Sequence, residues 1–223
     1  MDTAETSPSV SREKILRRYR RWRQLRTDIQ SAALKNIALS VFLKGAKRIG
    51  IADGNTLIAN SESEMMLAYD LALYSTGAGK TRAIDRYARS RPQTSDPDET
   101  LILEALRTAR FSWFRVIEKP ELAGMPLKDL MRGRELWLLD EGVEQTFKPG
   151  EFLATRVATV ERYVITCGAV VPFDQQMAAD VEIFLAIEGD PATYAALADN
   201  WRFAEHVYRM AVKRNLMSRV TYQ

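Results

Sequence analysis

FSWFRV, at residues 111–116, is the stretch that decides the fold, because the apolar period changes here from helical to the two-residue alternation of a strand. Its odd-numbered side chains fall on one face of that strand and its even-numbered side chains on the other. Further strands, with turn residues between them, are predicted at 135–140, 151–160 and 162–170. The sequence therefore predicts a small antiparallel β barrel or curled sheet over residues 111–173.

Helical patterns lie on both sides of this β module. Residues 12–110 carry apolar side chains at helical spacing, and residues 174–223 predict two C-terminal helices, the second from Pro191 to about Asn215. Because helices and strands are segregated rather than alternating, we expect an α+β fold and not a doubly wound sheet. The three regions form either separate units or one integrated domain, after a polar tail at residues 1–11 that predicts disorder.

The N-terminal region contains clear signals for the start and end of helices. A first helix is predicted over residues 12–29, with a helical continuation over 33–43 that stops at Gly45 and Gly50. Ser61 begins a capping box, in which its side-chain oxygen and the glutamate three residues later satisfy free backbone N–H groups.

Charge is unevenly distributed along the chain. The 223 residues have a net charge of +3, but residues 1–50 hold 12 Lys and Arg against 4 Asp and Glu, hence +8, which leaves 20 against 25, hence −5, for the remainder. Such asymmetry predicts an acidic partner for the N-terminal region, which is a nucleic acid, an anionic membrane or the acidic remainder of this protein.

The first predicted helix is amphipathic and is the main candidate for a binding surface. Its apolar stripe consists of Ile15, Tyr19, Trp22, Leu25 and Ile29. The arginines that point elsewhere are Arg17, Arg20, Arg21 and Arg23. We expect these four to bind the phosphates of a nucleic acid through charge-assisted hydrogen bonds. Two other interpretations stay open, namely arginines that face solvent or another protein, and a helix that lies on a membrane surface.

The counts of two residue types exclude much catalytic chemistry. Cys167 is the only cysteine, so the chain has no intrachain disulfide and no multi-cysteine zinc site. His206 is the only histidine, so any Ser-His-Asp triad would have to use it. The catalytic alternative that stays open is a pair in which Cys167 is the nucleophile and His206 is its base. However, the strand pattern predicts a buried Cys167, and the last helix places His206 on its polar side. We therefore name no catalytic residue.

Two further motifs have a structural interpretation. Residues 77–81 read GAGKT and end like a phosphate-binding P-loop, but Tyr74 stands where the first glycine belongs, and a helix pattern precedes the motif instead of a strand. The carboxylates at positions 140–141 and 96–98 could bind a hard cation or act as acid and base. Carboxylates at such spacing are more often turn residues and helix-start residues. We predict no cofactor site and no metal ligand.

Part of the β module resembles known sequences. The shared features are an aromatic-Arg-Val run at 114–116, a D-L-x-x-G-x-E-like turn at 129–135 and a Pro-Gly pair at 149–150. On these features, the segment 111–157 resembles a β segment that recurs in uncharacterised bacterial proteins. The resemblance implies a shared β module and implies no activity.

These observations predict a non-enzymatic macromolecule-binding protein that contacts a nucleic acid through its basic N-terminal helix. The alternative is a structural or regulatory protein-interaction module that self-associates through the apolar stripe of that helix. An enzyme that uses carboxylates, Tyr or Lys would need those groups to converge in a pocket. No segment reaches the roughly 18 apolar residues of a membrane span, and the N-terminus lacks the pattern of a secretory signal, so we expect a cytoplasmic protein.

Overall fold

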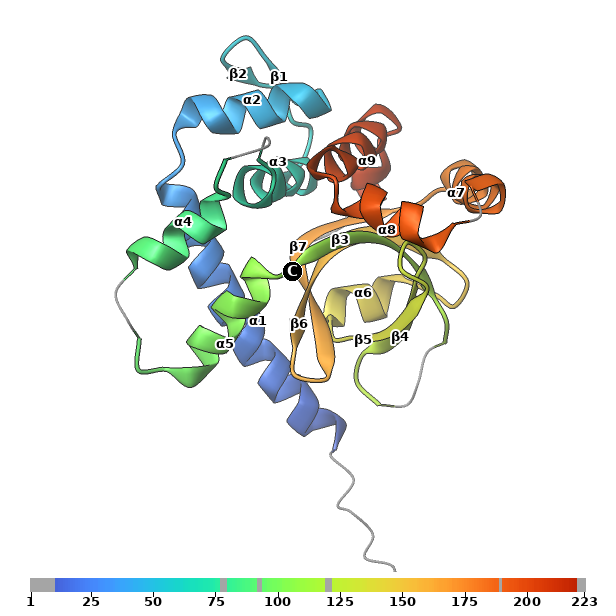
Figure 1. Cartoon of the computed structure of the whole chain (residues 1–223), viewed down its shortest axis with the longest axis horizontal. Coiled ribbons are helices and arrows are strands. Elements are labelled where there is room, and N and C mark those ends of the chain that lie inside the picture. The colour runs from blue at the N-terminus through green and yellow to red at the C-terminus, as the bar shows by residue number, and fades with distance from the viewer. Residues whose placement is uncertain (1–10, 77–79, 92–93, 119–121, 189, 220–223) are drawn as a thin grey trace, which may run out of the picture.

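The computed structural model describes residues 11–76, 80–91, 94–118, 122–188 and 190–219, and it confirms the predicted α+β class (Figure 1). The helices are α1 (Arg12–Lys35), α2 (Leu39–Ile49), α3 (Glu62–Tyr74), α4 (Ala83–Ser90), α5 (Pro97–Arg107), α6 (Glu141–Thr146), α7 (Gln175–Glu188), α8 (Pro191–Asp199), α9 (Trp201–Lys213) and the 3-10 helix η1 (Leu216–Arg219). The strands are β1 (Ala52–Asp53), β2 (Thr56–Leu57), β3 (Arg110–Val116), β4 (Met125–Asp129), β5 (Arg134–Leu138), β6 (Phe152–Val160) and β7 (Tyr163–Pro172).

Two helices of the N-terminal region begin where the sequence predicts. Ser11 caps α1, whereas the rest of the tail predicted at residues 1–11 lies outside the described residues. At α3, the hydroxyl oxygen of Ser61 accepts a hydrogen bond from the backbone N of Glu64 at 3.2 Å. The Glu64 carboxylate accepts from the backbone N of Asn60 at 2.7 Å, one residue earlier than the capping box requires. The predicted helix start is confirmed.

The boundary between α1 and α2 differs from the prediction. The first helix continues to Lys35, and Ala38 then adopts an extended conformation, with φ −61° and ψ 137°, before α2 begins. Gly45 does not stop the helix but lies inside α2, where an added Cβ would be 3.8 Å from Leu71 on α3. Gly50 ends α2 at φ +88°, as predicted, because glycine adopts this left-handed conformation without a steric penalty.

The last predicted helix is divided into two. It begins as predicted after Asp190, whose carboxylate accepts from the backbone N of Ala192 at 3.0 Å. At Asn200 the backbone is extended, with φ −71° and ψ 125°, and this residue ends α8 and caps α9. Its side-chain oxygen accepts from the backbone N of Arg202 at 3.0 Å, so a favourable N-cap competes with continuation of the helix.

Five strands close into a barrel in the order β3-β4-β5-β7-β6, and β6 pairs again with β3. Neighbouring strands are antiparallel except β5 and β7, which pair in parallel through Leu138 and Val164. This pair is the one departure from the predicted antiparallel arrangement among the described strands of the barrel. Closure leaves these strands no free edge on which another chain could add a strand.

Apolar side chains fill the interior of the barrel. The even-numbered residues Phe114 and Val116 of β3 point inward, so the predicted division of this strand into two faces is confirmed. The other members of the interior cluster are Met125, Leu127, Leu138, Val143, Phe147, Leu153, Val157, Val164 and Val170. Because Val143 belongs to α6, this helix packs on the barrel opening (Figure 1). The barrel is therefore a scaffold, and a ligand would bind outside it.

Helices cover two sides of the outer surface of the barrel (Figure 1). On one side, α1, α4 and α5 bury Trp22 together with Val160 and Ile165 of the β6–β7 hairpin. On the other side, α9 packs on β3, where the rings of Phe111 and Phe203 meet edge to face with centroids 5.7 Å apart. Within the described ranges, no helix has the length and apolar character that crossing a membrane requires.

The sequence pattern misses two elements that complete the barrel. Strand β4 escapes because Pro126 and the charges that follow interrupt its alternation, although its burial alternates in the structure. Helix α6 lies where a turn is expected at positions 140–141. It begins because the Asp140 carboxylate accepts from the backbone N of Gly142 and of Val143, both at 3.1 Å.

Gly124, immediately before β4, provides a test of the barrel packing. Its φ is +87°, and an added Cβ would lie 2.3 Å from the carbonyl oxygen of Leu138, whereas Gly133 has φ +66° and nothing within 4 Å. We expect Gly133→Ala to lower the free energy of unfolding by about 1 kcal/mol, and Gly124→Ala to lower it by about 2 kcal/mol more. Urea unfolding of both variants measures the difference, and equal losses would contradict this packing.

Candidate functional site

The arginines of α1 are paired with carboxylates of the same chain. Arg20 donates from Nε and Nη2 to the two carboxylate oxygens of Glu141 at 3.1 and 2.7 Å. Arg21 pairs with Asp96 at the start of α5. Two flanking ion pairs are Arg12–Glu144 and Arg18–Glu161. The basic N-terminal region and the acidic remainder of the chain are thus partners of each other.

The four arginines that the sequence singles out therefore have different environments. Arg20 and Arg21 form the ion pairs just described, and Arg23 also interacts within the chain. Arg17 is exposed and has no partner among the described residues. The structure does not bring the four together as one unpaired face.

The apolar stripe of α1 is part of the core of the chain. All five residues are at most 7% exposed: Ile15, Tyr19, Trp22, Leu25 and Ile29. They pack against α4, α5 and the β6–β7 hairpin in one cluster. Self-association through this stripe would require α1 to leave that core, so these residues give no support to the self-association alternative.

The acidic pairs act as helix caps and ion-pair partners. Asp140 caps α6, and its second carboxylate oxygen accepts from the hydroxyl of Thr166 at 2.5 Å. The hydrogen bond from Arg20 lowers the pKa of Glu141. Asp96 caps α5 through the backbone N of Asp98 at 2.9 Å. Over the part of the chain that the structure describes, His, Cys, Asp and Glu form no group of three that could hold a metal ion.

Cys167 and His206 lie in different environments. Cys167 is buried among apolar residues of β7 and its helical cover, and burial raises the pKa of its thiol to about 12. His206 is exposed on α9, where its Nδ1 lies 3.2 Å from Nη2 of Arg209. The expected buried cysteine and exposed histidine are confirmed.

The GAGKT motif follows a helix, as the sequence pattern indicates. Helix α3 ends at Tyr74, so the strand that a P-loop requires is replaced by a helix. Residues 77–79 of the motif lie outside the described residues. The nearest described residues on the two sides include Thr76 and Arg82, and both line a cavity.

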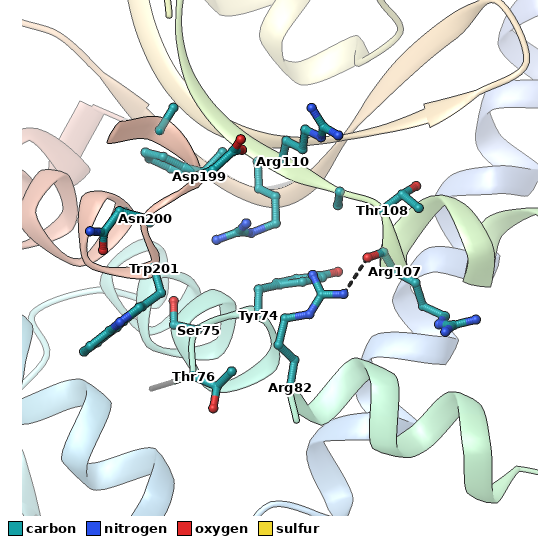
Figure 2. A pocket seen from close by; sticks show the side chains of 15 residues that line it. Tyr74, Ser75, Thr76, Arg82, Arg107, Thr108, Arg110, Asp199, Asn200 and Trp201 are labelled. Atoms are coloured by element: carbon teal, nitrogen blue, oxygen red, sulfur yellow. Dashed lines mark hydrogen bonds between the residues drawn. The ribbon is translucent and has the colours of Figure 1, made fainter. Parts of the chain in front are cut away.

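This cavity, of about 380 Å³, lies where the barrel meets α3, α5, α8 and α9 (Figure 2). Its cationic lining consists of Arg82, Arg107, Arg110 and Arg156. Asp199 is the single acidic residue among the described residues that line it. Tyr74 and Trp201 add aromatic surface, and Figure 2 shows Arg82 beside Tyr74. The lining favours an anion with an aromatic or apolar part.

Arg156 on β6 forms the buried floor of the cavity. Its Nε and Nη2 donate to the two carboxylate oxygens of Asp70 on α3 at 2.9 and 3.0 Å, and its guanidinium lies 4.7 Å from the centroid of the Tyr74 ring. Burial by itself lowers the pKa of Arg156, but the Asp70 carboxylate outweighs burial, so the pKa is raised and the group stays charged. Its Nη1 donates no hydrogen bond to the described residues.

Arg82, which precedes α4, is held in the same way. Its Nε and Nη2 donate to the two carboxylate oxygens of Asp85 at 2.7 and 3.0 Å, and Nη2 also donates to the carbonyl oxygen of Arg107 at 2.6 Å (Figure 2). Burial raises the pKa of Asp85, but the hydrogen bonds and charges of Arg82 and Arg107 lower it further than burial raises it. The Nη1 group of Arg82 has no acceptor among the described residues.

Two more polar groups of the cavity have no partner among the described residues. Arg110, the first residue of β3, is exposed and pairs with none of the described carboxylates. The Ser75 hydroxyl oxygen is buried and has no hydrogen-bond partner there. Asp199, in contrast, accepts from Nη2 of Arg132 at 2.6 Å. Arginine donors and a hydroxyl therefore remain available to a bound anion.

Sequence reasoning misses these arginines because they come from separate segments of the chain. Arg82, Arg107 and Arg110 lie at the ends of elements, in positions where arginine is common. Arg156 carries the one signal, since it is the only charge in a strand that otherwise consists of apolar residues and threonine. A buried charge in such a strand needs a partner from another element. The sequence does not show that Asp70 is that partner.

Comparison with known proteins gives a family but no function. A family model described as "Family of unknown function (DUF7986)" matches residues 13–182. No curated protein and no solved structure matches the chain. The matched range contains all four arginines of the cavity and excludes α8 and α9, which supply Asp199 and Trp201. The resemblance of residues 111–157 to a bacterial β segment stays a prediction.

Burial of Cys167 leads to a prediction for its reactivity. A pKa of about 12, against the ordinary 9.0, leaves about a thousandfold less thiolate at pH 8, and the thiolate is the reacting species. We expect a disulfide reagent such as DTNB to label the folded protein at least that much more slowly than the urea-unfolded protein. The absorbance of the released thiol measures both rates, and equal rates would contradict the buried position.

Proposed function

The chain belongs to a family of unknown function, DUF7986, and we propose that it is a non-enzymatic protein that binds the phosphates of a nucleic acid at its arginine-lined cavity. The observation that carries the proposal is the set of donors left over after internal pairing. Arg110 has no described acidic partner, and Arg82 and Arg156 each keep an unbonded Nη1 group beside the same cavity. Arginine donors of this kind form charge-assisted hydrogen bonds with phosphate.

The barrel supports the proposal at the level of fold class. Small five-stranded barrels include the OB-fold, which binds oligonucleotides and oligosaccharides. In this chain the barrel interior is filled, so the barrel supports the cavity from outside. Since a fold does not determine a function, the cavity rather than the barrel carries the argument.

The proposal includes a version in which α1 itself contacts the nucleic acid. Arg17 is the member of the predicted set that is exposed and has no partner among the described residues. Arg20 and Arg21 would first have to leave Glu141 and Asp96. A cytoplasmic location, which gives access to nucleic acid, is part of the same proposal.

A salt-dependent titration tests the proposal. We expect fluorescence anisotropy to show binding of a labelled single strand or duplex that weakens between about 50 and about 200 mM salt, because phosphate contacts release counterions. Arg110→Ala should weaken binding of every sequence and reduce the slope of log K against log salt by about 1. Arg17→Ala tests the α1 version in the same assay.

Arg89→Ala is the matched control for this titration. Arg89 is exposed on α4, has no partner among the described residues and does not line the cavity. Its replacement removes the same charge and should leave the affinity and the slope nearly unchanged. Binding that ignores salt, or an equal loss in the Arg89 and Arg110 variants, would overturn the cavity as the site.

A second candidate function is self-association, and one observation on α7 favours it. Ile183 and Ile187 on this helix are 58% and 75% exposed, although α7 also buries Val181. Side chains four residues apart on a helix are neighbours, and contiguous exposed apolar side chains are typical of an interface. We expect the mass from light scattering to be that of a dimer, and Ile183→Ser with Ile187→Ser to return it to a monomer. A monomeric mass for the unmodified chain would remove this candidate.

A further inference from the structure

We propose that the cavity binds a single nucleotide through a terminal phosphate, so that the ligand is a phosphomonoester and not the middle of a strand. The inference rests on the proposed function and narrows its ligand class. The shared chemistry is a nucleoside monophosphate, which is available as a free mononucleotide or as the phosphorylated end of an oligonucleotide. The geometry of two arginines, the size of the cavity and its aromatic wall support this class.

Arg82 and Arg156 are held in the same arrangement by two different carboxylates. Asp85 takes the Nε and Nη2 side of Arg82, and Asp70 takes the Nε and Nη2 side of Arg156. Each guanidinium is therefore fixed in orientation. Arg82 keeps Nη1 as its remaining donor, and Arg156 keeps Nη1 and the second N–H of Nη2. Donors that are already oriented lose little entropy on binding, so they recognise the shape of an anion more than its net charge.

A terminal phosphate suits this arrangement better than an internal phosphodiester. It carries about −1.5 to −2 charge at neutral pH and three acceptor oxygens, whereas a phosphodiester carries one negative charge. The Nη1 groups of Arg82 and Arg156 together supply four N–H bonds, and the buried Ser75 hydroxyl, which has no partner among the described residues, adds another donor. A dianion with three free oxygens can use more of these donors than a phosphodiester can.

The size of the cavity fits one nucleotide. Its volume of about 380 Å³ falls at the lower end of the roughly 300–1,000 Å³ that ligand pockets occupy. Elements close it on several sides, because its lining comes from α3, α5, β3, β6, α8 and α9. A strand that continued in both directions would need an open groove, so a strand end or a free nucleotide is the better fit.

Trp201, the first residue of α9, supplies a surface for the base. It lines the cavity together with Ser75 and Thr76 and is partly exposed. The guanidinium carbons of Arg48 and Arg202 lie 5.3 and 5.0 Å from its ring centroid. Aromatic rings and guanidinium planes both stack on nucleobases, and they do so without strong sequence preference.

The test compares one oligonucleotide in two forms, with a 5′-phosphate and with a 5′-hydroxyl, together with the matching pair at the 3′ end. We expect phosphorylation of at least one end to tighten binding about tenfold, and adenosine monophosphate to compete for the site. Trp201→Ala should weaken mononucleotide binding by about tenfold or more. Arg82→Lys keeps the charge but loses the fixed fork, so it should abolish the preference for a phosphorylated end. Arg89→Lys, on the α4 helix that follows Arg82, should keep this preference.

The outcomes separate this inference from the proposed function. Oligonucleotide binding that depends on Arg110 but is equal for phosphorylated and hydroxyl ends, without competition by adenosine monophosphate, overturns the inference and leaves the proposed function standing. Binding of adenosine monophosphate without binding of any oligonucleotide supports the ligand class and overturns the nucleic-acid function. Absence of both overturns both. The comparison of oligonucleotide ends uses the unmodified protein, so it tests the terminal-phosphate inference even if a variant fails to fold.

Discussion

The buried ion pair between Asp70 and Arg156 is the interaction on which the arrangement of helices and barrel depends. Asp70 is on α3 and Arg156 on the outer face of β6, so the pair fixes a helix of the N-terminal region to the barrel. Both residues are less than 10% exposed. Removing one partner of such a pair typically costs about 3–5 kcal/mol, because the other charge is left buried without compensation. This helix and this strand are therefore constrained to pack together.

Local geometry beside Arg156 is adapted to this pair. The pairing of β6 with β7 shifts register between Thr155 and Val157, and on β7 Gly168 has φ +119°. An added Cβ at Gly168 would lie 3.0 Å from the terminal methyl group of Met66 on α3, which is flexible, so the positive φ is the main reason for a glycine at this position. The irregularity in β7, the buried arginine and the close approach of α3 are parts of one packing solution. The floor of the cavity is a consequence of it.

The sequence predicts the parts of the fold that depend on local pattern. The alternation in residues 111–116 correctly separates Phe114 and Val116, inside the barrel, from Phe111, which packs on α9. The end of α8 at Asn200 is harder to predict. The spacing of apolar residues would continue one helix through this position, whereas the Asn200 side chain caps a new one. The parallel pairing of β5 with β7 depends on closure of the barrel, which no local pattern contains.

The candidate site is harder to predict from sequence than the fold, because the most visible charge in the sequence, that of the N-terminal arginines, is largely paired inside the chain. The excess of arginine in residues 1–50 suggested a surface for an acidic partner, but much of it meets Glu141, Asp96 and other carboxylates across the interface between α1 and the rest of the chain. Exposed pairs of this kind contribute only about 0–1 kcal/mol each, yet several along one helix fix its orientation.

The same balance limits what the cavity can recognise. Arg82 and Arg156 are matched by Asp85 and Asp70, so among the lining arginines Arg110 stands out as the charge without a described carboxylate partner. A site with so little excess charge attracts anions weakly at long range, because steering depends on net potential. Its selectivity must then come at short range, from donors whose directions are already fixed by their carboxylates. Fixed donors discriminate between anions of different shape, and this favours a compact terminal phosphate over the extended charge of a strand.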